Sequence, residues 1–300
     1  MSDANMTALL KEGEAASLRR QKTVQMVLRV LVWAAAVITV GVLVALIAYI
    51  LIMGIPNLSP KLFEWEYTTE NVSMMPAIIN TIVMTILSLL LAVPVGIFSA
   101  IYLVEYARRG NKLVAVVRTT AETLSGIPSI VYGLFGYLMF GVAFGWGYSM
   151  LSGAFTLAIM ILPSIMRTTE EALKAVPDSY REGSFGLGAG RLRTVFVVIL
   201  PSAMPGILAG VILGIGRITG ETAALIYTAG TVAGIPTTQI GNFPILDVLA
   251  SGRTLAIHMY ALLNEGLYME QAYATAVVLL VMVLLINGLS SLIAKKFTRS

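Results

Sequence analysis

Two ionisable residues lie four positions apart inside a long apolar stretch. Arg217 and Glu221 follow three glycines, Gly206, Gly210 and Gly214, and in a continuous helix all five would lie within a stripe roughly 80° wide. A charge at the middle of a bilayer costs at least about 2.5–3.5 kcal/mol, so this face must meet protein or a water-filled path. The planar guanidinium of Arg217 suits an oxyanion because it can bind two oxygen atoms at once.

Two interpretations of this pair remain open from the sequence. In the first, Arg217 and Glu221 form a structural ion pair that holds neighbouring helices together. In the second, which we favour, Arg217 meets an anion that crosses a pore, and Glu221 holds the guanidinium in place or gives way during transit. The three glycines predict a close approach by a neighbouring helix in either case, because small residues at four-residue spacing form such contacts.

The composition predicts that these residues lie in a membrane. Hydrophobic residues make up 57% of the chain and charged residues only 12%, against about 25% in soluble domains. Six apolar stretches have at least about the 20 residues that a transmembrane helix needs. We therefore expect an all-α membrane protein with about six transmembrane helices, at residues 27–55, 75–104, 123–144, 148–166, 195–230 and 272–294. The third and fourth stretches are joined so tightly, through residues 145–147, that a re-entrant pair is the alternative.

The positions of the basic residues predict the orientation. All but three of the 20 Lys and Arg residues fall in alternate segments, which is the pattern of cytoplasmic loops. The exceptions are Lys61 and Arg253, on the predicted outer side, and Arg217 within the fifth stretch. We expect both termini in the cytoplasm, a cytoplasmic tail at 1–26 and a membrane domain at 27–300. The long outer connection at 231–271 is expected to hold a short helix or two.

Several classes of chemistry are excluded by the residues that the chain lacks. There is no cysteine and only one histidine, His258, so neither a thiolate site nor a histidine cluster can bind a metal. No G-x-x-x-x-G-K-[ST] motif is present, so we do not expect this chain to hydrolyse ATP. The net charge of +4 lies at the ends of apolar runs, which argues against nucleic acid as a partner. We expect a surface or packing role for His258 and a local salt bridge between Arg118 and Glu122.

The predicted cytoplasmic segment at 167–196 contains a short helix. Pro177, Asp178 and Ser179 form a helix start, because Asp or Ser can cap free backbone N–H groups, and Glu182 lies near the first turn. Glycines end the helix soon afterwards. A short amphipathic helix between two spans is suited to docking against another protein, although it could also lack a partner.

This segment resembles the cytoplasmic signature of ABC importer permeases, which reads EAA, three residues, G, nine residues, I-x-L-P. Glu182-Gly183-Ser184 takes the EAA place, Gly188 falls on the glycine, and Val198-Ile199-Leu200-Pro201 fills the last part. The departures from the signature are small or isosteric. The resemblance implies a type I ABC importer permease fold in which a coupling helix around 178–190 fits a cleft on an ATPase subunit. Its expected contact residues are Asp178, Glu182, Gly183, Ser184 and Gly188.

A second motif is similar to one subgroup of these permeases. Arg217, Gly220, Glu221 and Thr222 form an R-x-x-G-E-T segment that resembles the permeases of the phosphate (Pst) importer, and residues 227–230 and 271–276 resemble its A-type member. The resemblance implies half of a phosphate pore in a bacterial or archaeal plasma (inner) membrane, in contact with lipid.

The same resemblance implies the partners of the chain. They would be a homologous C-type permease, an ATPase dimer that uses ATP and Mg²⁺, and a phosphate-binding protein, while this chain itself binds no cofactor. Permeases for other oxyanions, such as molybdate or sulfate, would carry a similar loop. A secondary transporter or channel that needs no ATPase is the alternative from another class; it predicts more ionisable residues within the spans and an inverted repeat, neither of which we find.

Overall fold

The chain forms a helical structure with one short β-hairpin. The structure is a computed structural model, and it describes residues 3–108, 110–240 and 243–298. Its α-helices are α1 (Asp3–Gly54), α2 (Met75–Ile101), α3 (Lys112–Ser125), α4 (Ser129–Gly136), α5 (Met150–Ala175), α6 (Asp178–Gly186), α7 (Arg191–Arg193), α8 (Leu200–Thr219), α9 (Ala223–Thr228), α10 (Leu255–Glu265) and α11 (Met269–Thr298). The 3₁₀ segments are η1 (Ile55–Asn57) and η2 (Pro60–Phe63), the π-helical segments are η3 (Tyr102–Tyr106), η4 (Tyr137–Ala143) and η5 (Thr194–Ile199), and the strands are β1 (Thr237–Ile240) and β2 (Phe243–Leu246).

The chain divides into two compact units, residues 1–53 and residues 54–300. The first unit is made of helix α1, which is apolar on every side between residues 30 and 53. A helix that is hydrophobic on every side is suited to lipid. Helix α1 begins at Asp3 and continues without a break into this apolar stretch. The cytoplasmic tail at 1–26 stays a prediction, and residues 1–2 lie outside the described residues.

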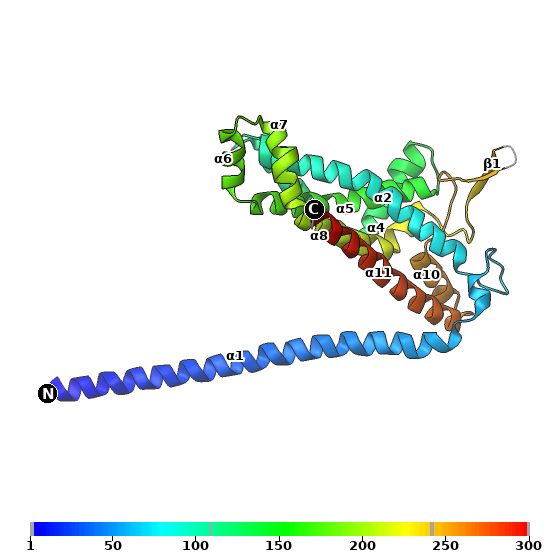
Figure 1. The fold of residues 1–300 in the computed structure, drawn as a ribbon. Helices are drawn as coiled ribbons and strands as arrows, with labels where there is room; N and C mark the ends of the chain where they lie inside the picture. The colour runs from blue at the N-terminus through cyan, green and yellow to red at the C-terminus, as the bar shows by residue number, and fades with distance from the viewer. Residues whose placement is uncertain (1–2, 109, 241–242, 299–300) are drawn as a thin grey trace. The chain divides into compact units, whose positions relative to one another are not determined.

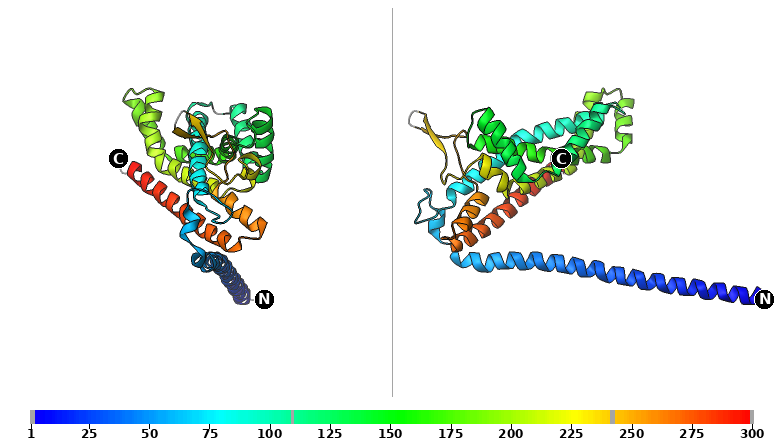
Figure 2. Two further views of the ribbon diagram at one scale, coloured as in Figure 1. Left: turned by 90° about the vertical axis from the view of Figure 1, so that its right-hand side faces the viewer. Right: turned by 180° about the vertical axis from the view of Figure 1, so that it is seen from behind.

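The second unit is built around helix α5. Helices α2 and α8 pack directly against α5, and α11 packs against α8. Apolar side chains of α5, among them Leu157, Ile161 and Ile165, are completely buried in the largest core cluster. Figures 1 and 2 show that the α6–α7 region and the β-hairpin lie at opposite ends of this unit.

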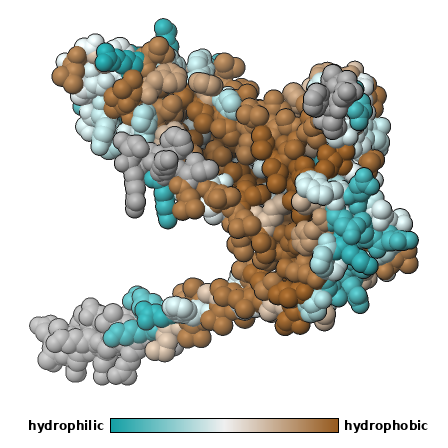
Figure 3. Space-filling model, turned by 45° about the vertical axis from the view of Figure 1, so that its right-hand side comes forward, coloured by the Kyte–Doolittle hydropathy of each residue, from teal (hydrophilic) through white to brown (hydrophobic). Residues whose placement is uncertain are grey.

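The surface of the second unit agrees with a membrane-spanning body. Apolar side chains cover the middle of the face shown in Figure 3, and hydrophilic side chains gather toward its ends. Among the residues that the structure describes, five helices are long and apolar enough to cross a membrane, and the number is six if a bent pair counts as one span. The predicted all-α class with about six spans is confirmed.

The third predicted span was wrong in its shape and bounds. Instead of one helix at 123–144, the chain forms two, Lys112–Ser125 and Ser129–Ala143, which are bent by 106°. The reason is local: Pro128 has no backbone N–H and its ring disfavours helical geometry at the preceding residue, while Gly126 adds backbone freedom. The bend divides this span close to its predicted inner end.

Two other boundaries differ from the prediction. Helix α5 continues to Ala175, so residues 167–175 belong to a helix and not to a loop. Helix α8 ends at Thr219, and α9 begins only at Ala223, so the stretch 195–230 is not one continuous helix. The break at residues 220–222 falls on the R-x-x-G-E-T motif.

The outer connection holds one helix, α10, and a hairpin that we did not predict. Strands β1 and β2 pair antiparallel, with Thr237 opposite Leu246 and Thr238 opposite Ile245. The dipeptide Gly241-Asn242 between them is of a type that favours two-residue hairpin turns, and it could have indicated the hairpin.

The glycines of α8 lie against α5. A Cβ atom on Gly206 would lie 2.7 Å from the Cβ atom of Ala172, and one on Gly210 would overlap the side chain of Thr168. At Gly214 the contact is looser, because the nearest atom, on Ile165, would be 3.8 Å away. The closest approach between the two helices is therefore at Gly206 and Gly210.

We expect Gly210→Ala to destabilise the protein by about 1–3 kcal/mol, the usual cost of extra atoms in a packed contact. Gly288→Ala, at a helix position where a Cβ would meet no atom within 4 Å, is the matched control and should leave stability unchanged or raise it slightly, because alanine favours a helix over glycine. Thermal unfolding of the detergent-solubilised protein measures both. Equal midpoints for the two variants would contradict the close contact with Thr168.

His258 is completely buried beneath the outer loops, which agrees with the expected packing role. Its ring meets that of Tyr67 edge-on, with 6.1 Å between the ring centroids. Tyr67 also lies under the guanidinium of Arg253, whose Cζ is 4.5 Å from the ring centroid. Burial, and then the positive charge of Arg253, lower the pKa of His258 from 6.5 to about 3.

Because the pKa of His258 is lower in the folded chain than in the unfolded one, the protein should lose stability as the pH falls below 6.5. At pH 5 the loss is about 2 kcal/mol, from about 1.36 kcal/mol per pH unit. We expect the thermal midpoint of the wild type to fall between pH 7 and pH 5, and that of His258→Gln to fall less. An identical pH dependence in the two proteins would overturn this assignment.

Candidate coupling surface and translocation path

Helix α6 begins and ends where the sequence predicts, but the side-chain cap expected from Asp178 or Ser179 does not form. Pro177 lies just before its first residue, and the carboxylate of Asp178 lies in the first turn, where the helix dipole favours a negative charge. At the other end, the N–H of Gly188 donates to Phe185 O and the N–H of Ala189 donates to Ser184 O. These two bonds form a Schellman motif, which needs a left-handed residue. Gly188 supplies it with φ of +84°.

The residues expected at the coupling surface lie together on α6 and its end. Gly183, Ser184 and Gly188 line a groove of about 640 Å³, together with Tyr180 and Leu187. The Ser184 hydroxyl is 2.8 Å from that of Thr194, which joins α6 to the beginning of η5. Leu187 is 92% exposed in the chain, so an apolar side chain projects at the edge of this groove.

Asp178 and Glu182 do not line the groove. Glu182 is exposed, and the Asp178 carboxylate accepts a hydrogen bond of 3.1 Å from Arg181. Arg181 itself was not singled out from the sequence, yet its guanidinium donates to Glu105, to Asp178 and to two carbonyls near the end of α5. Its guanidinium reaches Glu105 at the end of η3, with 2.7 Å between Nη2 and Oε1.

A polar cavity of about 370 Å³ runs along α5 to Arg217, and we call it the vestibule. Helix α3 forms one side of it and the second half of α5 another. The vestibule is lined by seven ionisable residues: Arg118, Glu122, Arg167, Glu170, Glu171, Lys174 and Arg217. Four are cationic and three are carboxylates, so the formal charge of the lining is +1.

Ion pairs occupy most of these charges. The carboxylate of Glu170, which is 8% exposed, accepts from Arg118 and from Lys174, each at 2.5 Å. Arg167 pairs with Glu171 at 3.1 Å on a more exposed surface. The predicted salt bridge between Arg118 and Glu122 is therefore wrong: Arg118 reaches across to α5, and Glu170 is the better-buried acceptor.

The two residues with which the sequence analysis began are separated in the structure. Because α8 ends at Thr219, Glu221 does not lie one helical turn beyond Arg217, and among the described residues the two form no ion pair. Instead, Glu221 Oε1 accepts from the N–H of Ala224 at 3.1 Å and caps α9. The predicted ion pair between Arg217 and Glu221 is therefore wrong, and Glu221 does not continue the helix face that carries the three glycines. Arg217 is exposed to the vestibule.

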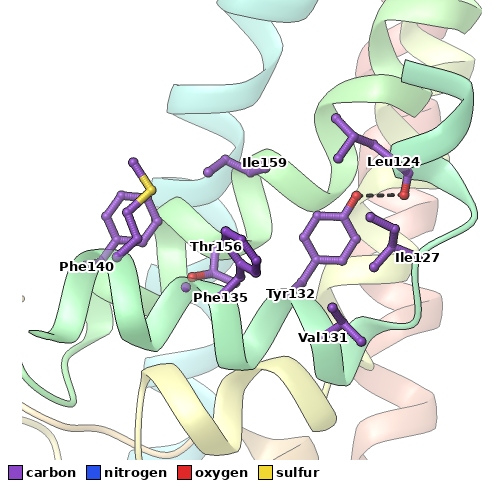
Figure 4. Close-up of a pocket in the computed structure, with 10 residues that line it drawn as sticks. Leu124, Ile127, Val131, Tyr132, Phe135, Phe140, Thr156 and Ile159 are labelled. Atoms are coloured by element: carbon purple, nitrogen blue, oxygen red, sulfur yellow. Dashed lines mark hydrogen bonds between the residues drawn. The ribbon is translucent and has the colours of Figure 1, made fainter. Parts of the chain in front are cut away.

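The bend between α3 and α4 is supported by a tyrosine. Tyr132 of α4 points back toward α3, and its hydroxyl donates to the carbonyl of Leu124 at 2.7 Å (Figure 4). This carbonyl lies in the last turn of α3, where helical partners run out. The same carbonyl also accepts from the N–H of Ile127 at 3.1 Å, so the Tyr132 hydroxyl adds a second hydrogen bond at the bend. An apolar pocket of about 180 Å³ lies beside this bond, lined by side chains such as Val131, Phe135 and Ile159.

Comparisons with known proteins agree with this arrangement. A family described as "Binding-protein-dependent transport system inner membrane component" matches residues 92–299. The chain is 35% identical to the probable ABC transporter permease protein YqgI of Bacillus subtilis, over 88% of this chain and 94% of that protein. It is 37% identical to the phosphate transport system permease protein PstA of Pasteurella multocida, over 78% of this chain and 81% of that protein.

Solved structures of ABC transporters share the fold. A bacterial alginate ABC transporter chain superposes with a TM-score of 0.59 at 16% identity, and covers 88% of this chain and 96% of its own. A chain of the MetNI methionine transporter gives a TM-score of 0.56 at 21% identity, over 75% of this chain and 94% of its own. The chain therefore belongs to the inner-membrane permease components of binding-protein-dependent ABC importers, multi-pass transport subunits whose ATPase activity lies in a partner subunit.

Proposed function

We propose that this chain is an A-type-like permease of an ATP-driven phosphate importer and forms half of its pore. The observation that carries the proposal is the vestibule, where Arg217 is the cation without a carboxylate partner among the described residues. The name of the Pasteurella relative supports phosphate as cargo. The name of the Bacillus relative states no substrate.

The chemistry of the vestibule suits an oxyanion in transit. Its formal charge of +1 attracts an anion, and the guanidinium of Arg217 can bind two oxygens of one phosphate. The carboxylates of Glu170 and Glu171 occupy the other cations, which weakens the hold on the cargo. A transport path must bind weakly enough to release its ion. Glu221, which caps α9, would act by placing the end of α8 and not by contact with the anion.

The remaining subunits follow from this role. A homologous C-type permease would complete the pore, and a phosphate-binding protein would deliver cargo to the outer face. A dimer of ATPase subunits, using ATP and Mg²⁺, would dock on α6. Tyr180, Phe185 and Leu187 are exposed on and beside this helix and offer an apolar contact surface.

We expect the complete complex, expressed in cells that lack their own high-affinity phosphate uptake, to import phosphate. Uptake of radiolabelled phosphate should require ATP and the cognate binding protein, and a tenfold excess of molybdate or sulfate should not reduce it.

The competing substrates are tested in the same cells. Import of labelled molybdate or sulfate in place of phosphate would assign the chain to another oxyanion. If the purified chain transports its substrate when no ATPase copurifies with it, the proposal of an ATP-driven importer is wrong.

We expect Arg217→Gln to reduce phosphate uptake by about tenfold or more, which corresponds to one lost charge-assisted hydrogen bond. Arg217→Lys, which keeps the charge but not the planar fork, should fall between Arg217→Gln and the wild type. Glu221→Gln should have the smaller effect, because an amide oxygen can still cap α9.

Lys112→Gln is the control for this series, because Lys112 is exposed at the start of α3 and lies outside the vestibule. All variants are compared at matched amounts of membrane-inserted complex. Wild-type uptake by Arg217→Gln would exclude the pore role, and loss of the assembled complex would favour a structural one.

A further inference from the structure

One guanidinium joins three elements at the end of the molecule that holds α6. Arg181 belongs to α6, and its side chain is 16% exposed. Its Nη2 donates to Glu105 Oε1 at 2.7 Å, and its Nε donates to the same oxygen at 3.2 Å. Glu105, which is 10% exposed, lies on η3, the direct continuation of α2.

The same guanidinium also caps α5. Its Nη1 donates to Val176 O at 2.8 Å, and its Nη2 donates to Leu173 O at 2.9 Å. These carbonyls belong to the end of α5, where helical partners run out and the dipole favours a cation. The arginine therefore ties α6 to the ends of two spans at once.

The surroundings make this junction rigid. Leu103 of η3, Leu173 of α5 and Val195 of η5 are buried in one apolar cluster. The hydrogen bonds that Arg181 donates to Glu105 also raise the pKa of the guanidinium above its ordinary value. A charged pair that is mostly shielded from water holds its geometry better than an exposed pair.

We infer that Arg181 is a positioning residue that transmits movement of α6 to α2 through Glu105, so that ATPase-driven displacement of α6 reorients α2 together with α5. This inference rests on the proposed docking of the ATPase on α6, but not on the identity of the cargo. Lysine could not replace the arginine, because one ammonium cannot bond to the carboxylate and to both carbonyls in this planar arrangement.

The two partners of Arg181 can be separated by mutation. Glu105→Gln removes the charge on α2 and leaves Arg181 on the carbonyls of α5, whereas Arg181→Gln loses both connections. Arg108→Gln is the matched control: Arg108 lies three residues after Glu105, is exposed, and forms no ion pair among the described residues.

The experiment uses the whole complex in liposomes, with the binding protein and its cognate ligand. It measures the ligand imported per ATP hydrolysed, next to the yield of assembled complex. For Arg181→Gln we expect wild-type assembly and continued ATP hydrolysis, with import per ATP reduced about tenfold or more, within the usual range of coupling between two sites. Glu105→Gln should reduce the ratio in the same direction, the double variant should add little, and Arg108→Gln should match the wild type.

Wild-type import per ATP in Arg181→Gln would overturn the inference. If that variant does not assemble, Glu105→Gln decides: an unchanged ratio there shows that the contact is only structural. A wild-type complex that imports an oxyanion other than phosphate would refute the proposed cargo but would leave this test intact, because the ratio is measured with whichever ligand the binding protein delivers.

Discussion

Close packing around α5 is the constraint on which the rest of the structure depends. About two thirds of its membrane-spanning window is buried within the chain, the largest share of any span. Helix α8 can approach it because Gly206 and Gly210 leave no side chain between the two backbones. With those contacts made, the second half of α5 carries the charges of the vestibule, and its final carbonyls meet Arg181. The two candidate sites are thus placed by one helix.

The features that could be predicted from the sequence are those that depend on the spacing of residues within one segment. The spacing from Glu182 to Pro201 indicated the family, because a short helix, its terminating glycine and the next span must follow one another at fixed distances. The number of spans could be predicted from the lengths of the apolar stretches and from the alternation of basic residues between segments, because both are also read along the chain. The glycine series predicted a helix contact, which lies against α5, although Gly214 takes little part in it.

Contacts between distant segments could not be predicted in this way. Arg181 and Glu105 are 76 residues apart, and nothing in either segment indicates the other. Glu170 lies within a helical turn of Lys174, but its bond to Arg118 depends on how α3 packs against α5. The error at Glu221 has the opposite cause. The prediction placed Glu221 on the same helix as Arg217, but α8 ends at Thr219, just before Gly220. Pro128 accounts for the place of the bend between α3 and α4, but the angle of 106° depends on how α4 packs.

The π-helical segments determine which way the helix faces point. A π-turn holds one residue more than an α-turn, and one residue corresponds to about 100° of rotation about the helix axis. Segment η5 lies directly before α8, so it sets the azimuth of Gly206 and Gly210 relative to α5 and of Arg217 relative to the vestibule. The length of η5, in addition to the residues of α8, therefore determines the direction in which the face of α8 that carries Arg217 points.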